Sequence, residues 1–461
     1  MKRRALLLFL LLVLSWPVIA SGQNDSGGQS PDLSTIEVLD LETAQRLALA
    51  ANPTMEQARA RVEQARARVE QAAAAWYPSL DLTAGASRTR LSDTAWETTG
   101  ALAALYGQTA DQTSEDYAVG LQASWILFNG FQREFAEEQA RYVHRSTEES
   151  RRNVTRLLAA AVAEAYLNAQ LAGTQVRIAG ADRDFYEQQL RDAQNRYDVG
   201  AGPWGDVLNI KVQLNSARTS LLLSQREEEA ALYGLASLLG LPGARLPEHV
   251  RLAELDREIA DKGVAEKVES LIEEALGTRP DVKELKLREK AAEAGVSVAE
   301  AGNWPILLVA GGINGARQDD PGFSGDDFGN TIGLNLSWNL FSGWADRARR
   351  FEAQQQVRET KATLRDLRNR IAAEVRQGVA LLEAAREQVV LQRESVRLVE
   401  ENRDLARSEY EAGEASLVRL NEAQRDLTRT HSRLAQAIVA FHRANQRLLA
   451  ALGREAVAAS P

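Results

Sequence analysis

Residues 121–131 read LQASWILFNGF, and residues 334–344 read LNLSWNLFSGW. In both stretches apolar residues alternate with small or polar ones, and both end in the pattern Trp-x-x-Phe-x-Gly-aromatic. Alternation over about ten residues predicts a β-strand with one apolar face. We therefore expect strands at 118–128 and 331–341.

The same repetition extends over most of the chain. Two markers, NP at 52–53 and YPSL at 77–80, recur at one common spacing as RP at 279–280 and WPIL at 304–307. YDVG at 197–200 recurs as YEAG at 410–413, at the same spacing as the two strand stretches above. Self-similarity at a fixed offset indicates internal structural repeats. Each reads helix, strand, loop, strand, long helix, turn and helix, and we place a first repeat at 39–240, a linker at 241–267 and a second repeat at 268–452.

Each repeat supplies one further strand, at 78–90 and 305–314, ahead of a polar loop rich in Gly and Asp. Ten alternating residues suit a strand of an outer-membrane barrel, which carries aromatic residues at its two interfaces with water. We predict such an interfacial girdle from the aromatic residues at the strand ends, which are Trp76, Tyr77, Trp125, Phe128, Trp304, Trp338 and Phe341. A strand pair of a soluble sandwich is the alternative interpretation.

Much of the remaining sequence predicts long coiled-coil helices. Ala58, Val62, Ala65, Val69 and Ala72 step by four and three residues, which is the spacing of a coiled-coil seam. Two stretches without proline, 133–196 and 346–409, predict helices of about 96 Å at about 1.5 Å per residue. Shorter helices of about half this length are expected to lie end to end beside the long ones, at 41–75, 206–239, 268–301 and 417–452.

The N-terminus has the pattern of a secretory signal peptide at 1–20. Basic residues at 2–4 precede ten apolar residues, too few for a membrane-spanning helix of about 20. The polar start of 21–38 predicts a disordered segment, and 453–461 is a short tail. Because no later stretch reaches eighteen apolar residues, we expect the chain to enter a membrane only as a closed β-barrel.

The composition argues against several functions. The chain of 461 residues has no Cys and only four scattered His, so thiolate and clustered-histidine metal sites are excluded. A net charge of −9 argues against a nucleic-acid-binding face. GAGPWG at 200–205 matches a nucleotide-binding fingerprint in letters only, because it follows a long helix and not a strand. We predict no enzyme activity and no cofactor.

Four strands per chain cannot close a barrel, because known bacterial barrels have at least about eight. Open sheet edges are not tolerated in lipid, so the strands predict an oligomer. Two copies would give eight strands, and three would give twelve. A periplasmic coiled-coil scaffold without a channel is the competing interpretation, but it explains the helices and not the strand pairs. A hydrolase with a helical insertion would need a catalytic cluster that the sequence does not show.

The chain resembles the TolC family of outer-membrane efflux proteins over about residues 39–452. The resemblance rests on motifs in a fixed order, which are LAANP at 49–53, WYPSL at 76–80, WILFNG at 125–130, RYDVG at 196–200 with DVL at 206–208, and LLGLP at 238–242. It implies a mixed α and β membrane protein. The implied assembly is a homotrimer with a twelve-stranded β-barrel in outer-membrane lipid, four strands per chain, continuous with a long periplasmic α-helical coiled-coil barrel. The linker at 241–267 then lies at the equator of the helical barrel.

The resemblance also implies a function. Members of this family are passive exit ducts of tripartite efflux pumps and type I secretion systems, where they dock a periplasmic adaptor protein and work with an inner-membrane transporter. The closed periplasmic mouth and the adaptor contacts then lie at two helix–turn–helix tips, which here hold Tyr197, Gly200, Asp206, Tyr410, Gly413, Arg419 and Glu422. Arg419 stands where the family's gate has an acid, so either a mixed ring of charges or a salt bridge of Arg419 between subunits is implied. The substrate class is left open between drug, metal ion and secreted protein.

Overall fold

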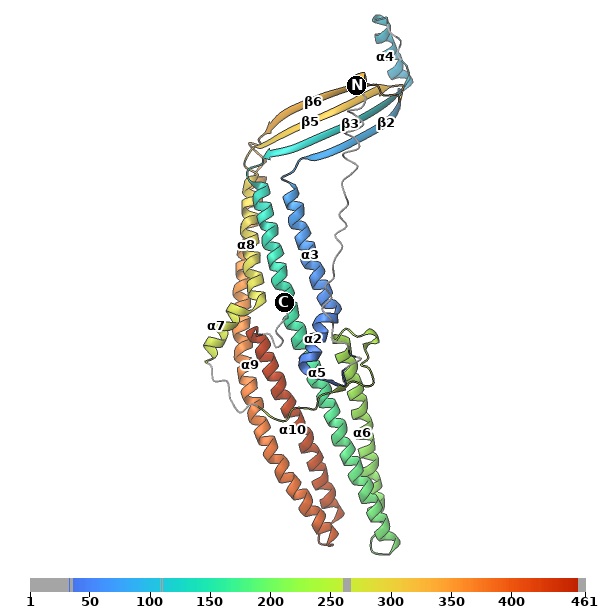
Figure 1. Cartoon of the computed structure of the whole chain (residues 1–461), viewed down its shortest axis with the longest axis vertical. Helices are drawn as coiled ribbons and strands as arrows, with labels where there is room; N and C mark the ends of the chain where they lie inside the picture. The colour runs from blue at the N-terminus through green and yellow to red at the C-terminus, as the bar shows by residue number, and fades with distance from the viewer. Residues whose placement is uncertain (1–32, 34–35, 108, 110, 260–266, 455–461) are drawn as a thin grey trace.

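The computed structural model describes residues 33, 36–107, 109, 111–259 and 267–454. Figure 1 shows a curved sheet at one end of an elongated bundle of helices. The expected signal peptide, and most of the segments at 21–38 and 453–461, lie outside the described residues.

The sheet is antiparallel, and its strands follow in the order β2 (Ser79–Arg90), β3 (Thr113–Phe128), β5 (Ile306–Gln318) and β6 (Phe328–Ser337). Each half of the chain contributes one strand pair, and β3 of the first half pairs with β5 of the second. Leu121 lies opposite Leu82 on one side and Ile313 on the other, so the apolar residues share one face. β2 and β6 are the outer strands of this sheet.

Several strand ends differ from the sequence prediction. β3 begins before residue 118 and β5 continues past 314, because polar residues beyond the alternating core still pair across the ladder, as Asp116 does with Gln318. β6 begins before residue 331 but ends at Ser337, short of the expected 341. Ser337 pairs with Ile306, the first residue of β5, so the described part of the chain offers no strand partner beyond it.

The loop expected after β2 contains a helix, α4 (Asp93–Leu105), which the sequence interpretation missed. Ser92 caps α4 by accepting a hydrogen bond from the N–H of Ala95 at 3.3 Å, and Gly107 follows with a left-handed φ of 72°. Serine before a helix and glycine after it are recognised start and stop signals, so α4 was detectable in the sequence. The matching loop of the second half carries a 3₁₀ turn, η3 (Gly325–Asp327).

Two long helices, α5 (Gln132–Asp198) and α9 (Ala345–Glu411), run from the sheet to the far end of the molecule (Figure 1). Each has 67 residues and is about 100 Å long at about 1.5 Å per residue. α6 (Trp204–Leu238) returns along α5, and α10 (Leu417–Leu452) returns along α9. α10 also packs against α5 and thereby joins the two halves. The ends of these four helices agree with the sequence prediction to within two residues.

The other two predicted helices, 41–75 and 268–301, are each broken in two. The pieces are α2 (Leu41–Ala51), α3 (Pro53–Ala74), α7 (Val268–Thr278) and α8 (Pro280–Ala301). The breaks fall at Asn52 and Arg279, whose ψ values of 128° and 130° are extended. Each residue precedes a proline, whose ring disfavours the helical conformation in the residue before it. The prediction of uninterrupted helices was therefore wrong.

Short strands tie the helix ends together midway along the molecule. β1 (Val38–Leu39) pairs in parallel with β4 (Arg251–Leu252), and a 3₁₀ turn, η2 (Pro242–Ala244), follows α6. Leu39 is fully buried, and its carbonyl accepts a hydrogen bond from the Tyr166 hydroxyl at 2.8 Å. The prediction of disorder up to residue 38 is therefore wrong for Val38, because pairing with the linker orders it.

Candidate functional site at the hairpin tips

Two hairpin tips form the end of the molecule opposite the sheet (Figure 1). The first tip (residues 197–206) joins α5 to α6, and the second tip (residues 410–420) joins α9 to α10. Gly200 and Gly413 end the long helices with left-handed φ values of 74° and 79°, a conformation that glycine adopts at little cost. No described atom lies within 4 Å of the place a Cβ would take at either glycine. A substitution there would therefore act through backbone strain alone.

The same two backbone hydrogen bonds close both tips. The N–H of Gly200 donates to the carbonyl of Tyr197 at 2.9 Å, and the N–H of Gly413 donates to the carbonyl of Tyr410 at 3.1 Å. The N–H of the next residue bonds to the preceding carbonyl in each tip. Ala201 donates to the carbonyl of Arg196 at 2.7 Å, and Glu414 donates to the carbonyl of Glu409 at 2.8 Å. These bonds satisfy carbonyls that the end of a helix leaves free. Both tips thus reverse the chain with the same backbone geometry.

The second tip packs against the first. The Arg196 guanidinium lies over the ring of Tyr410, 5.1 Å from its centroid. Leu417 is buried in one apolar cluster with Val207 of α6. Burial raises the pKa of Tyr410, and the negative charge of Asp206 adds to this rise while Arg196 opposes it. The structure therefore places Tyr410 of the second tip against Arg196, the residue directly before the first tip.

Arg419 is paired within its own hairpin. Its Nε donates to the Glu409 carboxylate at 3.0 Å. Its backbone N–H donates to Ser416 Oγ at 3.4 Å, and this bond caps α10. Glu422 is exposed further along the same helix. The second tip therefore carries mixed charges, and a salt bridge of Arg419 to another subunit would have to compete with Glu409.

The first tip carries aromatic residues at its surface. The rings of Tyr197 and Trp204 lie 5.0 Å apart, and the Lys211 ammonium lies 5.3 Å from the centroid of the same Trp204 ring. Sequence reasoning predicted Tyr197 here but missed Trp204, although it stands within GAGPWG. That motif is the turn between α5 and α6, with Pro203 directly before the second helix.

The seven aromatic residues of the expected girdle lie at the other end of the helices, where the strands begin and end. The Trp125 indole donates to the carbonyl of Trp76 at 3.0 Å, and the Trp338 indole donates to the carbonyl of Asn303 at 3.1 Å. Tyr77 is 74% exposed. Exposed aromatic rings with one polar edge suit the boundary between lipid and water.

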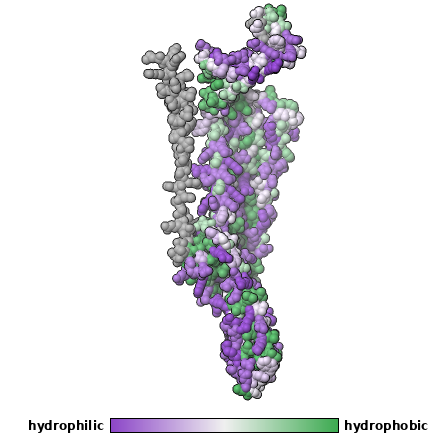
Figure 2. Space-filling model, turned by 90° about the vertical axis from the view of Figure 1, so that its right-hand side faces the viewer, coloured by the Kyte–Doolittle hydropathy of each residue, from purple (hydrophilic) through white to green (hydrophobic). Residues whose placement is uncertain are grey.

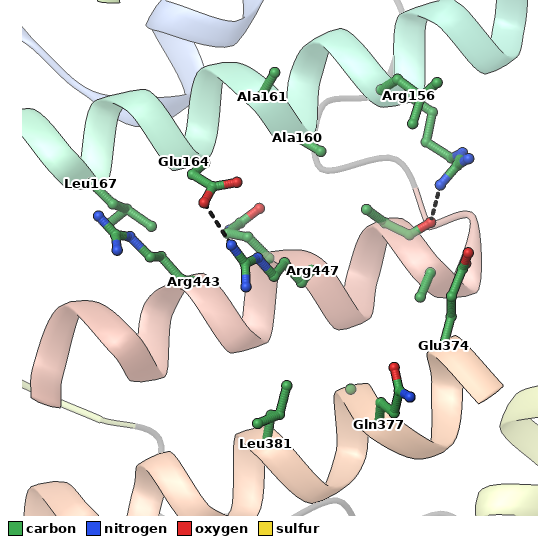
Figure 3. A pocket seen from close by; sticks show the side chains of 15 residues that line it. Arg156, Ala160, Ala161, Glu164, Leu167, Glu374, Gln377, Leu381, Arg443 and Arg447 are labelled. Carbon is green, nitrogen blue, oxygen red and sulfur yellow. Dashed lines mark hydrogen bonds and ion pairs between the residues drawn. The ribbon is translucent and has the colours of Figure 1, made fainter. Parts of the chain in front are cut away.

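Midway along the helices, α5, α9 and α10 line a hollow of about 500 Å³. Figure 3 shows Arg156, Glu164, Arg447 and Glu374 around it. Arg447 donates to Glu164 at 2.6 Å, and Arg156 donates to the carbonyl of Ala450 at 2.7 Å. These polar groups pair with each other and with the backbone across the helices. The hollow is therefore part of a joint between the two halves of the chain.

A buried ion cluster, which the sequence interpretation missed, lies at the break between α7 and α8. Arg279 is 3% exposed and donates to Asp281 at 2.7 Å and to Glu374 at 2.6 Å. Arg156 lies 3.8 Å from Asp281. Burial alone would raise the pKa of Asp281, but the hydrogen bonds and charge of Arg279, together with the charge of Arg156, bring it below its ordinary value.

Charged side chains on the helix surfaces pair along the helices, as Arg141 does with Glu137 and Arg226 with Glu229. Within the described residues, no group of three or more acidic or histidine side chains is arranged to hold a metal ion. Over the same part of the chain, no helix is both long enough and apolar enough to cross a membrane.

The sequence matches the model of a family described as "Outer membrane efflux protein" over residues 45–241 and 271–454. It is 28% identical over 409 residues to the pyoverdine export outer membrane protein OpmQ of Pseudomonas aeruginosa. The alignment covers 87% of this chain and 82% of that protein. It is 29% identical over 218 residues to the cation efflux system protein CusC of Escherichia coli. That alignment covers 47% of this chain and 45% of CusC.

Solved structures share this fold. A crystal structure of CusC matches with a TM-score of 0.75 at 24% identity, over 91% of this chain and 93% of that one. The outer membrane protein VceC of Vibrio cholerae matches with a TM-score of 0.71 at 19% identity, over 90% of this chain and 96% of that one.

Proposed function

The chain belongs to the outer membrane efflux protein family and is an exit duct of the outer membrane, and we propose how it builds that duct. Three copies place their four-stranded sheets side by side and close one twelve-stranded barrel in outer-membrane lipid. The helices of the three copies continue this barrel as a hollow shaft in the periplasm, built from two similar halves per chain. Substrates pass through it without any reaction.

The observation that carries this proposal is the pair of outer strands. β2 and β6 have partners on one side only within the described chain. Free backbone N–H and C=O groups along such an edge are not tolerated in lipid, so each edge needs a partner. Two copies would supply eight strands, the smallest barrel known in bacteria. The family pattern favours three copies, which supply twelve.

The hairpin tips are the proposed docking surface for a periplasmic adaptor protein, which couples the duct to an inner-membrane transporter. Backbone hydrogen bonds fix the chain reversal in both tips, and the rings of Tyr197 and Trp204 are exposed at the first one. Both features support a contact with another protein. The transporter supplies the energy. OpmQ and CusC are named for pyoverdine export and cation efflux, and we propose that the transporter, and not the duct, selects the substrate here.

Replacing Gly200 and Gly413 by Ala tests the docking role. Each left-handed position should then cost roughly 1–2 kcal/mol of local strain, with no clash. We expect adaptor capture by the purified assembly and export through the cognate pump to fall, while the yield in the outer membrane stays unchanged. Gly180→Ala, which lies within α5 with no described atom near its Cβ, is the matched control. Normal adaptor capture by the double variant would contradict a docking role and leave the tips as simple turns.

Planar-bilayer recording tests the duct itself. The purified protein should give discrete conductance steps, with a preference for cations because acidic groups at the mouth attract them. Arg419→Ser should increase that preference, since Glu409 loses its partner. Arg429→Ser, which removes an exposed arginine paired with Asp426, should leave the preference unchanged. Protein that inserts into the bilayer without any conductance would contradict a duct.

A further inference from the structure

One arginine that lines the hollow between α5, α9 and α10 has no bonding partner. Arg443 lies on α10, and its Nε and Nη2 atoms are buried without a hydrogen bond in the described chain. The other two arginines of the lining are bonded, Arg447 to Glu164 and Arg156 to the carbonyl of Ala450. In Figure 3 a dashed line joins Arg447 to Glu164, and none reaches Arg443. Buried N–H groups without a partner are costly and therefore rare in folded proteins.

The two unpartnered atoms belong to one edge of the guanidinium. The N–H groups of Nε and Nη2 point the same way and form a fork that matches the two oxygens of a carboxylate. The chain fills this fork elsewhere. Nε and Nη2 of Arg454 donate to the two oxygens of Glu274 at 2.7 and 2.8 Å. Those of Arg279 donate to the two oxygens of Asp281 at 3.1 and 2.7 Å. Arg443 has the same edge with no carboxylate on it.

The charges in and beside the hollow leave one cation over. The cations are Arg156, Arg279, Arg443 and Arg447, and the anions are Glu164, Asp281 and Glu374. Each anion is already bonded to an arginine. Arg447 holds Glu164, while Arg279 holds Asp281 and Glu374. One further group with a single negative charge would therefore balance the set, and Arg443 is the arginine that lacks such a group.

The electrostatic surroundings of Arg443 differ from those of a paired arginine. Burial lowers the pKa of Arg443, the charge of Glu164 opposes this, and the charge of Arg447 adds to it, so the pKa lies below its ordinary value. Burial also acts on Arg279, but the hydrogen bonds and charges of its two carboxylates raise its pKa above the ordinary value. A carboxylate on the free edge of Arg443 would stabilise its charge in the same way.

The hollow beside Arg443 has room for more than a carboxylate. Its volume of about 500 Å³ lies within the range of about 300–1,000 Å³ that is usual for small-molecule sites. Leu157 and Ala161 of α5 and Leu381 of α9 give it apolar walls. Because the Arg443 side chain makes no hydrogen bond in the described chain, it can turn its fork into the hollow without breaking one.

We propose that this hollow binds an organic anion with one carboxylate and an apolar body, and that Arg443 holds the carboxylate through Nε and Nη2. The apolar body then lies against Leu157, Ala161 and Leu381. Inorganic phosphate also has oxygens for the fork, but it has no apolar body and carries more than the single charge that is missing. The site goes beyond passive conduction, because it retains a ligand in the wall of the helical part, and one chain supplies all of it.

Apolar surface alone does not distinguish this site. Figure 2 shows hydrophobic patches at several places along the helical part of the molecule, between hydrophilic ones. An apolar compound therefore has other places to bind, and the fork of Arg443 is what sets the hollow apart. A ligand whose carboxylate is replaced by an amide keeps the apolar body and loses the charge. Comparing the two ligands isolates the contribution of the fork.

Ligand titration tests the site. Hexanoate with a fluorinated terminal methyl group is added to the detergent-solubilised assembly, and its binding is followed by fluorine NMR. The matching hexanamide is the uncharged ligand, and inorganic phosphate is the competitor without an apolar body. Arg443→Gln removes the charge and the fork, while Arg443→Lys keeps the charge without the fork. Arg429→Gln, which removes an exposed arginine of α10 paired with Asp426, is the matched control. Circular dichroism checks that each variant keeps its helices.

Wild type and Arg429→Gln should bind hexanoate equally well, and both Arg443 variants should bind it about tenfold more weakly or worse. Hexanamide should bind every variant with the same weak affinity, and an equal concentration of phosphate should not displace hexanoate.

Equal hexanoate binding by wild type and Arg443→Gln would overturn the site. Undiminished binding by Arg443→Lys would overturn the role of the fork, and displacement by phosphate would overturn the need for an apolar body. If wild type binds no hexanoate, the proposal is wrong as a whole. The conductance of the duct is measured separately and does not depend on any of these results.

Discussion

At the break between α2 and α3, the Asn52 side chain donates to the carbonyl of Leu238 at 2.7 Å. At the break between α7 and α8, Arg279 donates to the carbonyl of Ala451 at 3.1 Å. Leu238 and Ala451 are counterparts in the two repeats and lie in the last turns of α6 and α10. Both halves thus use the residue before a proline to hold the end of the returning helix.

The chemistry around that shared bond differs. Asn52 is neutral, and its side-chain oxygen also accepts from the N–H of Thr54 at 2.8 Å, which caps α3. Arg279 brings a buried charge that needs Asp281 and Glu374 beside it. The same backbone arrangement is therefore stabilised by one neutral amide side chain in the first half. In the second half it is stabilised by buried charges that depend on one another. The second joint should be the more sensitive to mutation and to pH.

Arg279→Ala should have the largest effect. It leaves Asp281 in a mostly buried site without its main partner, and breaking a buried pair costs about 3–5 kcal/mol. Thermal unfolding of the helices in detergent, followed by circular dichroism, measures the loss. Arg370→Ala, which removes an exposed arginine of α9 paired with the exposed Asp366, should stay within about 0.5 kcal/mol. Equal losses for the two variants would contradict a special role for Arg279.

Asn52→Ala should cost less, about 1–2 kcal/mol, since it removes a cap and leaves one carbonyl unpaired. The same unfolding measurement applies. Asn52→Asp is the informative companion, because it keeps the oxygen that caps α3 but loses the N–H that reaches Leu238. A loss as large as that of Arg279→Ala would remove the contrast between the two joints.

Giving the second joint the chemistry of the first should cost less still. In Arg279→Asn with Asp281→Thr both buried charges leave together, and removing a buried pair is often close to neutral. We expect the double variant to be clearly more stable than Arg279→Ala alone. If the double variant is the less stable of the two, Arg279 acts through Glu374 or the Ala451 carbonyl, and not mainly through Asp281.

The smallest expected effect is on pH dependence. The pKa of Asp281 lies below its ordinary value of 3.8 in the folded protein, so its contribution is present above that value and is lost as the pH falls through the folded pKa. Arg279 and Arg156 are the cations that face it, and Glu374 shares Arg279 with it. The stability difference between wild type and Asp281→Asn should therefore shrink below about pH 4. The difference between wild type and Asn52→Ala should not, and a parallel loss in both would contradict this assignment.

The sequence predicted much of the fold because its signals are local. Alternation identified the strands, stretches without proline identified the long helices, and Gly200 and Gly413 identified the tips. Its errors have physical causes. Proline after Asn52 and Arg279 was given too little weight, and α4 was hidden in a loop that looked merely polar. The contact of Arg196 with Tyr410 joins residues from opposite halves of the chain, and no local pattern reports such a pairing.

The proposal that three copies complete the duct is tested most directly by the mass of the native assembly. The protein should be extracted from the outer membrane in mild detergent and its particles weighed by native mass spectrometry. The account predicts three chains per particle, because only neighbouring copies can pair with the free edges of β2 and β6. A stable particle of one chain, with its four-stranded sheet intact, would contradict it.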